Sequence, residues 1–136
     1  MKSLSTLIDL KQRDLDEKRR VLVQLEEQQD KLEQNAKQLK EELAHESALA
    51  SGNPDIARFF GEFAKSNKQK QEVLAEKKVT LLKLIEVQRE NIREAFTELK
   101  QLEIAKENRD DEEAANATRK ENAELDEIGL RGFLGD

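Results

Sequence analysis

The sequence predicts an all-α fold, a long two-helix antiparallel coiled-coil hairpin, and three observations carry this prediction. A heptad pattern runs in one phase from residue 1 to residue 50. A second series of the same spacing follows a single Gly-Asn-Pro interruption at residues 52–54. Charged residues make up 40% of the 136-residue chain and hydrophobic residues 36%. A highly charged chain with this periodicity is typical of a coiled coil, so we expect residues 1–136 to form a single coiled-coil unit.

The first helix is expected at about residues 3–51. Its heptad positions a and d form a narrow seam that must be covered by a second helix. The a positions are Met1, Ile8, Leu15, Leu22, Gln29, Ala36, Leu43 and Ala50, and the d positions are Leu4, Lys11, Lys18, Leu25, Leu32, Leu39 and Glu46.

The turn is expected at residues 52–53. Gly52 can adopt the left-handed conformation that ends a helix, and Asn53 can cap the next helix. Pro54, the only proline, suits the first helical position, and Asp55 meets the positive end of the helix dipole. With the chain reversing at Asn53, facing residues of the two helices should have numbers that add up to about 106, twice that position.

The second helix is expected at about residues 54–128. Its seam consists of Leu74, Leu81, Ile85, Ile92, Ala95, Leu99 and Leu102, widened by Leu84 and Phe96. The apolar spacing stops after Ala105, where the first helix has no residues left to pair. The remainder should project as a polar helix, which is marginal in water unless another surface binds it.

Three glycines at three-residue spacing should end this helix near Ile128 and leave a flexible tail at residues 129–136. The tail carries Leu130, Phe133 and Leu134. Two interpretations remain open: a frayed terminus, or a short hydrophobic hook that docks on a partner.

An aromatic cluster, Phe59-Phe60-Gly61-Glu62-Phe63, lies close to the predicted turn. On a helix Phe59 and Phe63 share one face, while Phe60 points about 100° away. Either the rings fold over the loop and cap the tip, or they form an exposed apolar patch that binds a partner. Gly61 costs about 1 kcal/mol within a helix, and its missing side chain would allow a partner to approach closely.

The residue types argue against an enzyme. The chain has no cysteine, and its one histidine, His45, follows Glu42 at a spacing that di-iron sites use only in duplicate and with two further glutamates. We expect His45 to lie on the surface, and we expect no catalytic, cofactor-binding or metal-binding residues. The net charge of −6 argues against nucleic acid as a partner. With no signal-peptide core and no apolar run of about 18 residues for membrane insertion, we expect a cytoplasmic protein.

Four segments resemble the flagellar export protein FliJ family and, more loosely, the stalk proteins of injectisome type III secretion: residues 15–20, 59–63, 94–100 and 124–128. The resemblance implies a two-helix stalk, similar to that of rotary ATPases, which links a hexameric export ATPase to the cytoplasmic domain of the membrane export gate. It also implies an escort role for export chaperones and a position peripheral to the membrane-embedded export apparatus.

The same resemblance suggests where partners bind. The gate contact would fall on Phe59 and Phe63, with Leu39 and Leu43 nearby, and the helix termini would lie at the ATPase pore. The alternative is a generic cytosolic tethering or scaffold coiled coil without a secretion role. The sequence leaves open whether the system is flagellar or injectisome, the oligomeric state, and which end contacts which partner.

Overall fold

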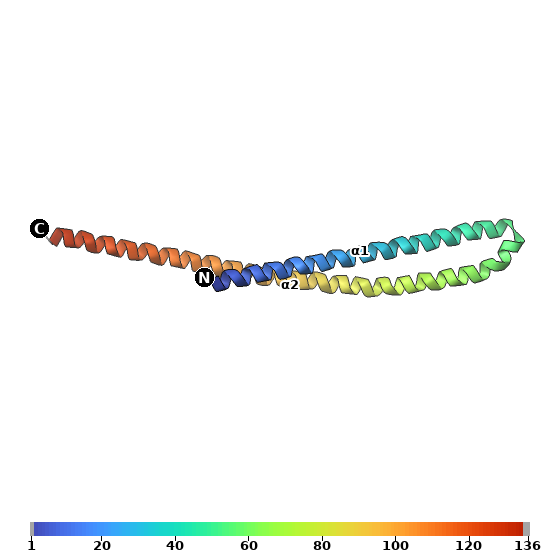
Figure 1. The fold of residues 1–136 in the computed structure, drawn as a ribbon, viewed down its shortest axis with the longest axis horizontal. Helices are drawn as coiled ribbons and strands as arrows, with labels where there is room; N and C mark the ends of the chain where they lie inside the picture. Colours follow the sequence, from blue (N-terminus) through green and yellow to red (C-terminus); the bar gives the residue numbers. More distant parts are fainter. Residues whose placement is uncertain (1, 135–136) are drawn as a thin grey trace. The chain divides into compact units, whose positions relative to one another are not determined.

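The computed structural model describes residues 2–134, and all of these except Asn53 lie in one of two helices (Figure 1). Helix α1 spans Lys2–Gly52 and helix α2 spans Pro54–Leu134. Residues 2–134 contain no strand. The predicted all-α helical hairpin is therefore confirmed, with the chain reversal at Asn53 rather than across two residues.

The packing of the chain divides it into two units. Unit 1 comprises Met1–Leu15 and Glu94–Asp136, and unit 2 comprises Asp16–Arg93. Unit 2 contains the turn, and each unit contains a part of both helices.

The turn in unit 2 is built by Asn53. Its side-chain oxygen Oδ1 accepts a 2.9 Å hydrogen bond from the backbone N–H of Asp55, and its carbonyl accepts one of 3.0 Å from Ala57. Asn53 therefore caps α2 as predicted, and Pro54 occupies the first position of that helix. The prediction of a left-handed Gly52 is wrong, because no described residue has a positive φ. The last turn of α1 instead closes with a hydrogen bond from the hydroxyl of Ser51 to the carbonyl of Ala48.

The seam of unit 2 follows the predicted heptads. Every described a and d side chain of α1 is at least half-buried, which confirms the phase read from the sequence. On α2, Leu81 and Ile85 are buried and Leu74 and Ile92 are half-buried. Leu84 does not widen the seam as predicted, because it is 51% exposed.

Polar side chains complete the seam of unit 2. The amide of Asn67 donates a 2.8 Å hydrogen bond to the carbonyl of Leu39, and the amide of Gln88 donates one of 2.9 Å to the carbonyl of Lys18. Both pairs of residue numbers add up to 106, the value predicted from the position of the turn. The two helices therefore run antiparallel in the predicted register.

In unit 1 the buried side chains are Leu15, Ala95 and Leu99. The ammonium of Lys11 forms a 3.1 Å ion pair with Glu98 across the seam. Phe96 is 44% exposed, so it also fails to widen the seam, and the ammonium of Lys100 lies 5.3 Å from the centre of its ring. Half-buried residues continue at the heptad spacing as far as Arg109, one turn beyond the predicted end at Ala105.

The predicted end of α2 near Ile128 is wrong, since the helix continues to Leu134. Gly129 and Gly132 have helical backbone angles rather than positive φ, and an i,i+4 ion pair of 2.6 Å between Arg131 and Glu127 spans the first of them. Residues 129–134 are thus helical and not a tail. The last two residues of the predicted tail, 135–136, lie outside the described residues.

Candidate partner-binding sites

Two aromatic rings beside the turn of unit 2 are exposed to solvent. Phe59 is 71% exposed and Phe63 is 37% exposed, whereas Phe60 is half-buried at a seam position. The four-residue spacing places Phe59 and Phe63 on one face of α2, as predicted. The alternative in which the rings cap the tip is wrong for Phe59, because that ring remains largely in contact with solvent. We call Phe59 and Phe63 the aromatic tip.

The two leucines that were predicted to lie near this surface belong to the seam. Leu39 and Leu43 are half-buried at d and a positions of α1. Leu39 also lines a hollow on one flank of the seam. Both leucines therefore stabilise the hairpin while leaving part of their side chains accessible to a partner.

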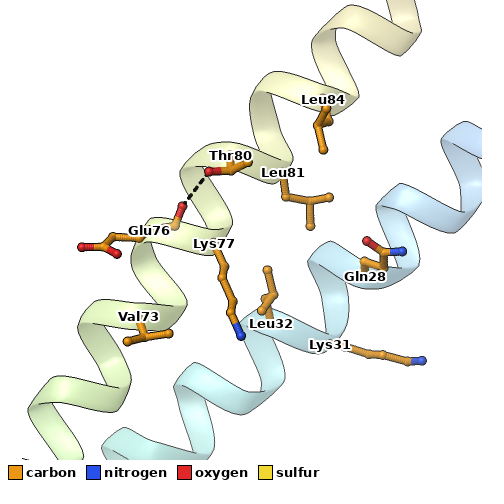
Figure 2. Close-up of a pocket in the computed structure, with 9 residues that line it drawn as sticks. All are labelled: Gln28, Lys31, Leu32, Val73, Glu76, Lys77, Thr80, Leu81 and Leu84. Carbon is orange, nitrogen blue, oxygen red and sulfur yellow. Dashed lines mark hydrogen bonds between the residues drawn. The ribbon is translucent and has the colours of Figure 1, made fainter.

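A groove that the sequence analysis missed runs along the same flank of unit 2. Its first hollow, of about 620 Å³, has Leu32 and the buried Leu81 between the helices and Val73 and Leu84 at its edge (Figure 2). A second hollow, of about 660 Å³, shares Val73 and continues toward Leu39. We call the two hollows together the flank groove. Its further lining residues are Gln28, Lys31, Asn35, Gln38, Glu42, Ser66, Gln69, Lys70, Leu74, Glu76, Lys77 and Thr80.

The opposite flank of unit 2 is bridged by ion pairs. Lys78 lies 3.5 Å from Glu33 and Arg89 lies 3.8 Å from Glu26, each pair joining α2 to α1. A third hollow lies on that flank, and Glu33 and Lys78 are among its lining residues. No such cross-helix ion pair is found in the flank groove within the described part of unit 2. The two flanks of the seam therefore differ in their chemistry.

The C-terminal segment of α2, in unit 1, is the most exposed part of the molecule. Every side chain from residue 110 to residue 132 is exposed. Leu125, Ile128 and Leu130 are 57%, 64% and 64% exposed, so these apolar groups contact mainly water. Of the predicted hydrophobic hook only Leu130 can be placed, because the side chains of Phe133 and Leu134 lie outside the described residues.

This segment is also strongly acidic. Unit 2 carries fifteen basic and fifteen acidic residues, so the net charge of −6 comes entirely from unit 1. At the start of the segment, a 2.8 Å hydrogen bond from the ammonium of Lys106 to Asp110 lowers the pKa of that carboxyl and raises the pKa of the ammonium.

His45 is exposed, as expected. Among the described residues, no group of three or more histidine, aspartate or glutamate side chains is arranged to hold a metal ion. Within the same residues, neither helix has a stretch long and apolar enough to cross a membrane.

Comparison with known proteins gives one match. The model of one protein family, described as flagellar FliJ protein, matches residues 1–136, the whole chain. No curated protein and no solved structure matches the chain.

Proposed function

Because the chain belongs to the flagellar FliJ protein family, a non-catalytic coiled-coil component of flagellar export, we propose that it is the stalk that links the export ATPase to the membrane export gate. The observation that carries this proposal is that each of the two units exposes an apolar surface of its own. The aromatic tip lies in unit 2, and the exposed acidic segment at residues 110–132 lies in unit 1. A linking protein needs two such surfaces.

The ATPase contact is assigned to residues 110–132. In proteins most of the stability of a helix comes from packing of its apolar face, and no seam within the described residues covers residues 110–132. Association with a surface of the ATPase hexamer would bury Leu125 and Ile128, which share one face of the helix, and would stabilise the helix.

The gate contact is assigned to the aromatic tip. Exposed aromatic rings contribute most to protein interfaces when a partner removes them from water, because each ring buries a large apolar area. Phe59 and Phe63 are available for such a contact, and the accessible parts of Leu39 and Leu43 would lie within reach of the same partner. The protein would then act in the cytoplasm, at the periphery of the export apparatus, and it would also bind export chaperones.

The proposal is tested by binding the full chain to the ATPase hexamer and to the cytoplasmic domain of the gate, and by measuring ATP hydrolysis with and without the chain. Deletion of residues 110–136 keeps the seam of unit 1 through Arg109. It should weaken the ATPase contact and leave the gate contact unchanged. The double variant Phe59→Ala, Phe63→Ala is the matched control and should have the opposite effect.

The outcomes separate the possible functions. If the truncated chain binds the ATPase as well as the full chain does, the assignment of the ATPase contact to residues 110–132 is wrong. If the full chain binds neither component, the alternative function of a generic tethering or scaffold coiled coil is correct.

A further inference from the structure

The flank groove is apolar both at its floor and at its edge. The packing of two helices against each other requires the apolar floor but not the apolar edge. Leu32 and Leu81 lie between the helices, and Val73 and Leu84 are 48% and 51% exposed beside them (Figure 2). Val87, one turn further along α2, is 58% exposed. The apolar surface of α2 is therefore wider than the stripe that α1 covers.

Three lysines and two glutamates, Glu42 and Glu76, line the groove, although the chain as a whole is acidic. Lys70 and Lys77 from α2 and Lys31 from α1 line the groove, and none of them makes an ion pair in the described part of the chain. Figure 2 shows Lys77 reaching toward α1, whereas the carboxylate of Glu76 points away from the groove.

We propose that the flank groove binds an amphipathic helix of a partner protein, with acidic residues beside its apolar stripe. The apolar floor would bury the stripe, and the lysines would pair with the flanking carboxylates. From Gln28 to Glu42 the groove follows α1 for about 21 Å, which matches about four turns of a docked helix. The inference goes beyond the stalk function, because neither the aromatic tip nor residues 110–132 take part in it, and Leu39 alone is shared with the proposed gate contact.

Two designed helical peptides test the proposal with the full chain. Both are about 21 residues long and carry the same leucine stripe, but glutamates flank the stripe in one peptide and lysines in the other. At low salt the chain should bind the glutamate-flanked peptide at least about tenfold more tightly, as measured by fluorescence anisotropy. The double variant Lys31→Glu, Lys77→Glu should reverse this preference.

A pair of matched variants tests the location. Val73→Glu with Leu84→Glu should weaken binding of the glutamate-flanked peptide at least about tenfold. Val79→Glu with Leu82→Glu places the same charges on exposed apolar positions that do not line the groove, 55% and 42% exposed in the native chain, and should change binding less than about twofold. Circular dichroism establishes that all variants remain helical.

Three results would overturn the proposal. The first is equal affinity for the two peptides, and the second is an equal loss of binding in the two matched variants. The third is a dimer of the native chain in sedimentation that Val73→Glu with Leu84→Glu converts to a monomer, because a second copy would then occupy the groove.

Discussion

The side-chain amide of Asn67 donates a 2.8 Å hydrogen bond to the backbone carbonyl of Leu39, across the seam between α2 and α1. Asn67 is only 3% exposed, and its oxygen accepts a 2.5 Å hydrogen bond from the amide of Gln71. The nitrogen and the oxygen of the buried amide therefore both have hydrogen-bond partners, which avoids the free-energy cost of burying a polar group without a partner. Since a helix shift would break the bond to Leu39, Asn67 selects one register of the hairpin.

Asn67→Leu should therefore separate stability from register. The leucine buries more apolar surface, so the free energy of unfolding should stay unchanged or rise by about 1 kcal/mol. The register should become less well defined. The chain has no cysteine, so the substitutions Glu33→Cys and Lys78→Cys place two thiols at a native ion pair, where a short bismaleimide can introduce a single cross-link. This cross-link should form completely in the Asn67 background and incompletely in the Asn67→Leu background. Complete formation in both would show that Asn67 does not set the register.

Ile85→Ala should lower the free energy of unfolding by about 2–4 kcal/mol, because Ile85 is only 2% exposed in a seam one side chain wide. Leu84→Ala is the control at the neighbouring position, where the side chain is 51% exposed, and it should cost less than about 1 kcal/mol. Urea unfolding followed by circular dichroism measures both values. Equal costs would mean that the seam has been assigned to the wrong face of α2.

Gly61→Ala should raise the free energy of unfolding by about 1 kcal/mol. Gly61 lies within α2 without a positive φ, and an added methyl group would meet no atom within 4 Å. Thermal unfolding measures the gain. If Gly61 lets a partner approach the tip closely, the same variant should bind the gate domain more weakly, and unchanged binding would show that the glycine has no part in the contact.

Phe59→Ala with Phe63→Ala should abolish gate binding and leave the helical content unchanged, because Phe59 is mostly exposed and Phe63 partly so. Phe60→Ala should instead lower the melting temperature, since Phe60 is half-buried in the seam. Binding assays and thermal unfolding distinguish the two roles. Loss of helicity in the double variant would assign the rings to the stability of the tip.

Much of this fold could be predicted because a coiled-coil seam repeats a simple pattern. The heptads of α1 kept one phase from Leu4 to Ala50, and the Asn53-Pro54 pair fixed the reversal, so the register followed by counting. Asn67 and Gln88 were not predicted as seam residues, because their contribution is a hydrogen bond to the opposite backbone and not apolar burial. Extending the heptad spacing backwards from Leu74 would have identified Asn67.

The candidate sites could be predicted only in part. The four-residue spacing of Phe59 and Phe63 was sufficient to place them on one face. The flank groove was not predicted, because Leu84 was assigned to the seam and Val73 lies outside the a and d positions of the heptad pattern. The end of α2 was misplaced because glycine lowers helix stability without preventing a helix when its neighbours form one.

The confinement of the net negative charge to unit 1 has a kinetic consequence. A basic partner surface is drawn toward unit 1 from a distance, so its association rate should be high at low ionic strength and fall steeply as salt is added. At about 0.15 M salt the attraction extends only about 8 Å, and it then acts mainly on surfaces already near contact. Partners of unit 2, which is neutral overall, would meet the protein at rates less sensitive to salt, except for an acidic partner of the flank groove. Stopped-flow association at several salt concentrations would therefore report which unit a partner meets first.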